Sequence, residues 1–130
     1  MSGYSLDANV LIDALLEYEP AHRELQRVAN TGAGMWVSRM AWIEVLSKGN
    51  EAAVRDALAF LARFKVDEID EEVSWRAAVL RRERPRLRSP DAIILATAQM
   101  RSRILITRNT KDFPPEMPGV RVPYTRSETT

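Results

Sequence analysis

The segment YSLDANVLIDALL, residues 4–16, changes its pattern at one acidic residue, Asp7. The three residues before Asp7 are typical of a brief strand, and the apolar residues after it recur at the spacing of one helix face. A short strand that leads directly into a helix is the repeating unit of a parallel sheet covered by helices. This segment therefore predicts an α/β protein and places an acidic side chain at the end of a strand.

The same alternation continues along the rest of the chain. Further strands are predicted at 35–38, 65–69 and 104–106, with an edge strand at 119–123. Helices are predicted at 20–31, 40–49, 51–64 and 71–84. A last, mostly apolar helix is predicted to start with Ser89 as its cap and Pro90 in its first turn. We expect a three-layer α/β/α sandwich with a mainly parallel sheet, made by one domain over 1–124, and a polar, flexible tail over 125–130.

The composition narrows the class of protein. The 130 residues are 45% hydrophobic and 28% charged, as in a folded domain, and they include no cysteine. Disulfides, thiolate metal sites and cysteine nucleophiles are therefore excluded. No apolar run approaches the ~20 residues of a membrane span, and no secretory signal is recognisable, so we expect a cytoplasmic protein without a membrane partner. The only histidine, His22, stands among polar residues, so a histidine-based mechanism lacks support.

The net charge of +1 hides an uneven distribution. Residues 1–74 hold 7 basic and 13 acidic side chains, whereas residues 75–111 hold 10 basic and 2 acidic ones. The run at 81–88 contains five arginines and ends three residues before Asp91, where it is placed to hold a nucleic-acid backbone. An exposed helix end with favourably placed cations explains the run equally well. The candidate RNA-binding residues are Arg81, Arg82, Arg84, Arg86, Arg88 and Arg108.

Acidic residues stand where predicted strands end and helices begin. Asp7 follows the first strand, Asp91 stands at the start of the apolar helix, and Asp112 follows the strand predicted at 104–106. Glu44 lies among apolar residues in the helix after the second strand. Because the carboxyl ends of parallel strands meet at one edge of a sheet, we expect these side chains to converge there.

Each acidic residue also has an ordinary role open to it. Asp7 could cap the first helix, Asp91 could complement a helix dipole, and Asp112 could form a turn. Glu44 could be a surface residue, and Asp13 could belong to the polar face of the first helix. Taken singly these roles are the more common ones, but together they leave the gathering of acids at strand ends unexplained.

A cluster of carboxylates needs a cation, because like charges close together otherwise force some of the groups to protonate. Oxygen ligands without histidine or cysteine suit Mg²⁺, for which Mn²⁺ can substitute. Such an ion can activate water and stabilise charge on a phosphate. Carboxylates beside a basic segment therefore predict hydrolysis of phosphodiester bonds.

Four segments of the chain match one known family in order and spacing. They are LDANVLID at 6–13, SRMAWIEVL at 38–46, PDAIILATA at 90–98 and ITRNTKDF at 106–113. The chain thereby resembles the PIN-domain ribonucleases, and within them the VapC-type toxins of type II toxin–antitoxin pairs. This resemblance implies an α/β sandwich and a metal-dependent endoribonuclease.

The resemblance also implies roles for particular residues. It makes Asp7, Glu44 and Asp91 metal-site acids, with Asn9 and Thr107 as supporting polar residues that orient ligands and water. Many members carry an aspartate where this chain has Asn109, which supplies no charge. The fourth catalytic position is therefore left between Asn109 and Asp112.

The partners that the resemblance implies are an RNA substrate, a second copy of the chain and a cognate antitoxin. An antitoxin segment would cross the groove between the 20–31 and 51–64 helices, with Trp36, Trp42 and Phe60 as candidate anchors, although core packing is the more ordinary use of these aromatics. Two other functions stay open. The Asn109 substitution favours a non-catalytic module that binds RNA or protein, whereas a structure-specific DNA nuclease is disfavoured by the short length. The sequence does not identify the RNA.

Overall fold

The computed structural model describes residues 3–126 and contains one five-stranded sheet. Within this range its strands are β1 (Tyr4–Leu6), β2 (Met35–Ser38), β3 (Lys65–Asp67), β4 (Ile104–Ile106) and β5 (Val120–Arg121). They lie in the order β3-β2-β1-β4-β5, and every adjacent pair is parallel. The predicted strands are all present, and the two longest predictions end earlier, at Asp67 and Arg121.

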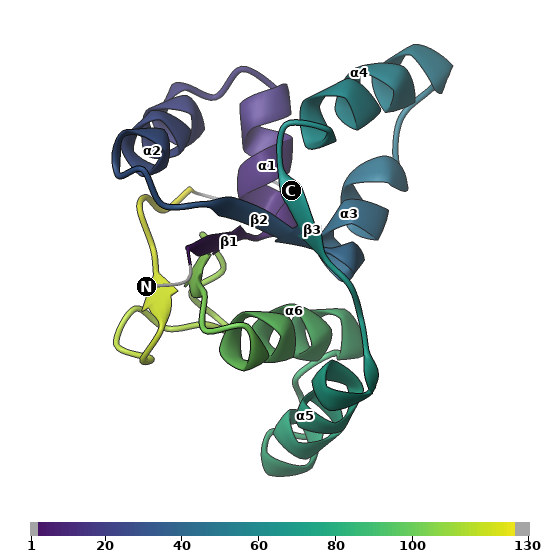
Figure 1. Ribbon diagram of the computed structural model, residues 1–130, viewed down its shortest axis with the longest axis vertical. Helices are drawn as coiled ribbons and strands as arrows, with labels where there is room; N and C mark the ends of the chain where they lie inside the picture. The colour runs from purple at the N-terminus through teal and green to yellow at the C-terminus, as the bar shows by residue number, and fades with distance from the viewer. Residues whose placement is uncertain (1–2, 127–130) are drawn as a thin grey trace.

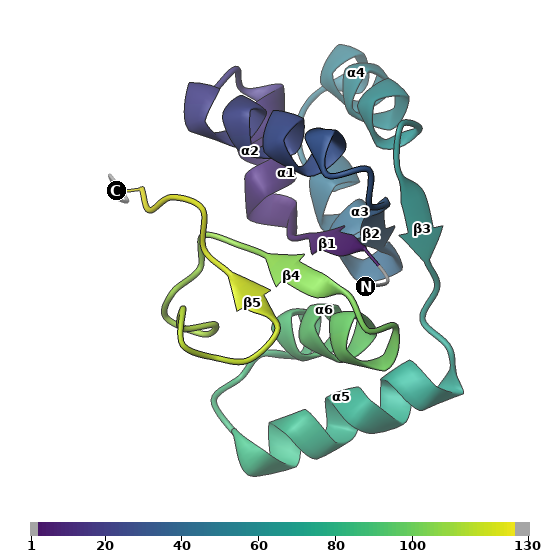
Figure 2. The same cartoon turned by 60° about the vertical axis from the view of Figure 1, so that its left-hand side comes forward.

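Helices cover both faces of this sheet. They are α1 (Ala8–Leu15), α2 (Glu19–Asn30), α3 (Arg39–Leu46), α4 (Glu51–Leu61), α5 (Glu71–Glu83) and α6 (Ser89–Met100). Figures 1 and 2 show α1 to α4 on one side of the strands and α5 with α6 on the other. The predicted α/β/α sandwich is confirmed, with a sheet that is parallel throughout.

Local signals explain where most helices begin. The side chains of Ser38, Asn50 and Asp70 accept backbone N–H groups at 2.9–3.0 Å and cap α3, α4 and α5. The predicted cap at Ser89 is wrong by one residue, because Arg88 occupies the cap position and Ser89 is already helical. The cap position of α6 makes no side-chain hydrogen bond, so the following proline sets the start of this helix.

The buried core joins the sheet to α1 on one face and to α6 on the other. All three residues of β1 are buried, as are seven of the twelve residues of α6, which packs between the sheet and α5. This explains why α6 reads as nearly all small or apolar. Within residues 3–126, no helix combines the length and apolar character that crossing a membrane would need.

The strand order reverses at β1, because β2 lies on one side of it and β4 on the other. Side chains that follow β1 and β4 therefore face each other across the point where ligands bind in parallel sheets. The register pairs Leu6 with Ile106, so Asp7 and Thr107 leave the sheet side by side.

The end of the predicted domain runs back toward α1. Of the tail predicted over 125–130, residues 127–130 lie outside the described range. Within that range, Arg126 Nη1 lies 2.8 Å from Asp13 Oδ1, and the guanidinium carbon of Arg126 lies 4.0 Å from the ring centroid of Tyr18. These contacts bring the C-terminal segment beside the carboxyl ends of the central strands.

Candidate active site

Asp7 is held by neutral donors at the end of β1. Its Oδ1 accepts the backbone N–H of Ala8 at 2.7 Å, so Asp7 does cap α1. Its Oδ2 accepts from the hydroxyl of Thr107 at 2.7 Å and from the amide of Asn9 at 3.3 Å. Burial raises the pKa of Asp7 to about 6 in spite of these hydrogen bonds, which lower it, while nearby acids raise it further. The cap and the predicted site role therefore coexist in one side chain.

The hydroxyl of Thr107 links Asp7 to the loop after β4. Its Oγ1 accepts the backbone N–H of Asn109 at 3.0 Å, and its one hydrogen is left to donate to Asp7. The amide of Asn9 lies 3.4 Å from the same Oγ1, and the Oδ1 of Asn9 accepts the backbone N–H of Arg108 at 3.4 Å. Asn9 and Thr107 are thus both hydrogen-bonded to Asp7, and the supporting role that the resemblance implies for them stays a prediction.

Glu44 and Asp91 approach Asp7 from helices on opposite faces of the sheet. Glu44, on α3, is half-buried, and burial raises its pKa with a further contribution from the charge of Asp91. Asp91, in the first turn of α6, is buried, and burial followed by the charge of Asp112 raises its pKa. Arg88 Nε lies 3.7 Å from Asp91 Oδ2 and opposes that rise. Because Glu44 is half-buried, it is not the ordinary surface residue that was the alternative to a site role.

A cavity of about 530 Å³ brings these three carboxylates together. Asp7, Glu44 and Asp91 all line it. Its other lining residues include Asn9, Lys48, Arg88, Arg108 and Asn109. A second cavity, of about 910 Å³, shares Asp91 with the first and extends to Asp112. The acids predicted from separate strand ends and helices therefore flank two adjoining cavities.

Asn109 and Asp112 form a pair at the rim of the second cavity. Asn109 Nδ2 donates to Asp112 Oδ2 at 3.0 Å, and the backbone N–H of Asp112 donates to Asn109 Oδ1 at 3.3 Å. The carboxylate of Asp112 is near enough to raise the pKa of Asp91. In this arrangement the amide of Asn109 orients the carboxylate of Asp112.

The oxygen donors around the cavity suit a metal that needs few direct ligands. Among the residues in 3–126, no three acidic or histidine side chains stand close enough to share one ion as ligands. Mg²⁺ does not need such a cage, since it usually takes one or two carboxylates and keeps several waters. Asp7, Glu44 and Asp91 offer oxygen donors around one cavity, and their raised pKa values show that positive charge there would be favourable. These residues fit Mg²⁺ held through few direct contacts.

The arginines of the 81–88 run separate into different environments. Arg88 lines both acid-bearing cavities, and Arg86 lines the larger one. Arg81 Nε donates to the carbonyl of Leu87 at 2.9 Å and so supports the loop between α5 and α6. Arg82 is exposed on α5 and lines neither acid-bearing cavity. The run is therefore not one uniform charged surface.

Comparisons with known proteins agree with this architecture. The sequence pattern of the PIN domain family matches residues 4–114. The chain belongs to the PIN domain family. The resemblance that the four segments predicted is thereby confirmed, although comparison with curated proteins gives no match.

Solved structures place this PIN domain among similar folds. A toxin–antitoxin complex from Klebsiella pneumoniae contains a chain that is 34% identical, with a TM-score of 0.85 over 95% of this PIN domain and 100% of that chain. DNA-bound VapBC from Salmonella typhimurium is 25% identical, with a TM-score of 0.72 over 93% and 96%. FitAcB from Neisseria gonorrhoeae is 22% identical, with a TM-score of 0.69 over 92% and 97%, and this likeness shows the fold alone.

One residue of this PIN domain has a larger role than its sequence context indicated. Asp13 is 1% exposed and is no ordinary polar-face residue. It accepts from Arg108 Nε at 2.6 Å, from the hydroxyl of Tyr124 at 2.8 Å and from Arg126 Nη1 at 2.8 Å. The available signal was an acid inside the apolar run of α1. Arg108, predicted to bind RNA, lines both acid-bearing cavities while it pairs with Asp13.

Proposed function

We propose that this PIN domain is a Mg²⁺-dependent endoribonuclease and the toxin of a toxin–antitoxin pair. The observation that carries the proposal is the convergence of Asp7, Glu44 and Asp91 on one cavity, although they come from the junction of β1 with α1, from α3 and from α6. The donors to Asp7 in the described structure are all neutral. Carboxylate oxygens grouped in this way suit a hard divalent cation, which also binds the phosphate oxygens of a nucleic acid.

The residues divide the proposed work according to their positions. Asp7 and Asp91 would be the principal ligands, and Glu44 would position either the metal or the attacking water. When bound, Mg²⁺ lowers the pKa of water and offsets charge on the phosphate. Thr107 and Asn9 keep the carboxylate of Asp7 in one orientation through their hydrogen bonds to its Oδ2. In the hydrolysis a water oxygen bonds to phosphorus, and the bond from phosphorus to the leaving ribose oxygen breaks.

The cations around the cavities support a polyanionic substrate. A metal site alone acts on many phosphate esters, so the preference for RNA rests on the groove and its charges. The larger cavity is lined by six basic side chains, namely those of Lys48, Arg86, Arg88, Arg108, Lys111 and Arg126. These side chains would hold the sugar–phosphate backbone on either side of the acids.

Partners are proposed on the strength of the similar structures. The Klebsiella pneumoniae structure is a toxin–antitoxin complex, and its 34% identity over the whole of that chain supports a cognate antitoxin here. We extend the proposal to a homodimer that acts in the cytoplasm. The aromatic anchors suggested for the antitoxin groove have internal contacts. Arg103 stacks on Trp36 at 3.6 Å, Arg39 lies over Trp42 at 4.7 Å, and Phe60 packs against Phe64.

Single substitutions of the principal acids test the nuclease proposal. Asp7→Asn and Asp91→Asn should each reduce Mg²⁺-dependent RNA cleavage by at least about a hundredfold, since loss of an outer-shell partner alone costs 10–100-fold at metal sites. Both variants should keep the circular dichroism spectrum of the parent. Asp56→Asn, at an exposed position on α4, is the matched control and should cleave normally. Undiminished cleavage by either site variant would contradict the assignment.

A non-catalytic RNA- or protein-binding module is the second candidate. The amide at Asn109 and the absence of a three-ligand group within residues 3–126 favour it. Calorimetric titration with Mn²⁺ separates the two functions. The nuclease should bind Mn²⁺ in a manner that Asp91→Asn abolishes, whereas a scaffold should bind no metal at these acids. Sequencing of RNA ends after induced expression, against Asp7→Asn, would identify the substrate.

A further inference from the structure

The guanidinium group of Arg84, at the end of α5, differs in the hydrogen bonding of its two terminal nitrogens. One terminal nitrogen, Nη2, donates to the backbone carbonyl of Asp112 at 2.5 Å. The other, Nη1, is buried and has no hydrogen-bond partner among the described residues. A buried, charged N–H group without an acceptor is unfavourable, so an oxygen acceptor that reached this guanidinium group would be stabilised.

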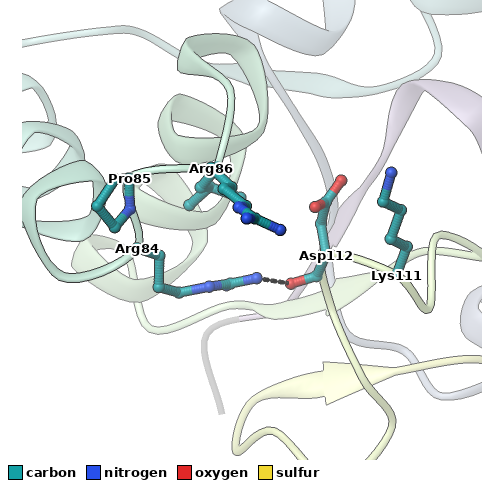
Figure 3. A pocket seen from close by; sticks show the side chains of 6 residues that line it. Arg84, Pro85, Arg86, Lys111 and Asp112 are labelled. Carbon is teal, nitrogen blue, oxygen red and sulfur yellow. Dashed lines mark hydrogen bonds between the residues drawn. The ribbon is translucent and has the colours of Figure 1, made fainter.

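The cavity beside Arg84 has the charge of an anion site. It measures about 450 Å³, and we call it the Arg84 pocket. Its lining comprises Arg84, Pro85, Arg86, Leu87, Lys111 and Asp112. Figure 3 shows Arg84 and Arg86 reaching toward Asp112 from one side, with Lys111 on the other side. Three cations therefore surround one acid, whose Oδ2 already accepts from Asn109.

The Arg84 pocket adjoins the acid cavities. Arg86, Lys111 and Asp112 line both this pocket and the 910 Å³ cavity that contains Asp91. An extended polyanion with one phosphate at the acids would carry its next phosphates along this shared wall. A guanidinium group binds phosphate through paired N–H donors and stays charged at every relevant pH.

We propose that the Arg84 pocket binds a backbone phosphate of the RNA adjacent to the phosphate that is cut. The inference rests on the nuclease function proposed above, and it adds a defined subsite to it. It also selects among the arginines of the 81–88 run. Arg84 and Arg86 hold the phosphate together with Lys111, whereas Arg81 supports the loop through Leu87.

Binding of a short single-stranded RNA, followed by fluorescence anisotropy, tests the subsite. The titrations use chelator and no divalent metal, so that cleavage does not interfere. Arg84→Ala and Arg86→Ala should each weaken binding about tenfold, as expected for loss of one charge-assisted contact. The slope of log affinity against log salt should become shallower by about 0.7 in each. Arg82→Ala removes the same charge outside the pocket and should change neither quantity appreciably.

A second measurement keeps the subsite separate from the nuclease function. Inorganic phosphate should shift the Nε–H resonance of Arg84 in ¹⁵N-labelled protein, and acetate at equal ionic strength should not. If the parent protein cleaves no RNA, the nuclease proposal fails while this titration still decides the pocket.

The alternative role for Arg84 is to hold the loop at Asp112 without contacting substrate. In that case Arg84→Ala would lower kcat, leave RNA affinity and salt slope equal to those of Arg82→Ala, and leave phosphate without effect on the Nε–H resonance. That outcome would overturn the phosphate subsite.

Discussion

Asp7 and Glu24 are equally buried, at 4% exposed, yet their environments are opposite. Glu24, on α2, accepts from two guanidinium groups, those of Arg27 and Arg121, at 2.8–3.0 Å. Burial raises the pKa of Glu24, but the hydrogen bonds from these arginines outweigh burial and lower it. Among residues 3–126, the donors of hydrogen bonds to Asp7 are neutral, and its pKa is raised. The exposed fraction is thus the same for both side chains, whereas their hydrogen-bond partners differ in charge.

The same division extends to the other acids. Asp13 and Asp67 are buried with arginine partners at 2.6–3.0 Å, as Glu24 is. The three acids around the cavity have raised pKa values, even though Arg88 Nε lies 3.7 Å from Asp91 Oδ2. The charges of the arginine-paired acids are already neutralised, and these ion pairs hold segments of the chain together. An added cation would stabilise the cavity acids, as the proposed metal site requires.

The largest expected effect comes from making the same substitution, aspartate to asparagine, in a paired acid and in a cavity acid. Asp13→Asn should lower the free energy of unfolding by about 3 kcal/mol, because it leaves Arg108 and Arg126 without their carboxylate. We place the value at the low end for a buried pair because both arginine side chains keep 21–38% of their exposure. Asp7→Asn should leave stability unchanged or increase it, because it removes a disfavoured charge. Urea unfolding with chelator measures both.

Asp56→Asn, an exposed substitution, sets the baseline for this pair of measurements and should shift stability by no more than about 0.5 kcal/mol. Equal destabilisation by Asp7→Asn and Asp13→Asn would remove the distinction between paired acids and cavity acids.

Sequence alone predicted the cavity acids better than the paired ones. Asp7 and Asp91 could be predicted because each stands at a junction that local sequence patterns reveal. The parallel topology then brings such junctions together. The strands and helices could be predicted for the same reason, and the errors are confined to their ends and to the cap of α6.

The paired acids depend on contacts that no local pattern encodes. Arg126 reaches Asp13 across 113 positions of the chain, and Arg121 reaches Glu24 across 97. The Arg126 contact requires the course of the C-terminal segment after β5, which is irregular, and the Arg121 contact requires the position of β5 at the edge of the sheet. The Asp13 cluster was missed because its meaning depends on this tertiary path and not on spacing.

The pH dependence of stability should also separate the two groups. The folded pKa of Asp7 is about 6, against an ordinary value of 3.8, so the folded state retains a proton that the unfolded state has lost. Stability without metal should therefore fall as pH rises from about 4 to 6, by about 3 kcal/mol for this group. Glu24 has a lowered pKa, so its contribution is present above its ordinary value of 4.5 and is lost as pH falls through its folded pKa.

Urea unfolding across this pH range, with chelator present, measures these contributions. Asp7→Asn should flatten the decline between pH 4 and 6, whereas Glu24→Gln should reduce the loss of stability on the acid side. Saturating Mg²⁺ should oppose the decline in the parent, because the ion favours the ionised form of Asp7. An unchanged slope in Asp7→Asn would mean that another group is responsible.

The smallest expected effect concerns the pair at the cavity rim, where Asn109 donates to Asp112 at 3.0 Å. If Asp112 supplies the charge, Asp112→Asn should weaken Mn²⁺ binding by up to about tenfold, because outer-shell carboxylates contribute on that scale. Asn109→Asp should tighten Mn²⁺ binding several-fold and lower metal-free stability by about 1 kcal/mol, since two carboxylates would then adjoin without a donor between them.

Asn109→Ala is the matched control for this pair, because it removes the hydrogen bond to Asp112 without adding charge. A Mn²⁺ affinity that falls in Asn109→Ala but is unchanged in Asp112→Asn would assign the fourth position to the amide oxygen of Asn109. A fall in both variants would mean that Asn109 acts by orienting Asp112. Asp112 would then be intermediate between the acids paired with a side chain and the acids proposed to bind a metal. Calorimetric titration of the three variants distinguishes these outcomes.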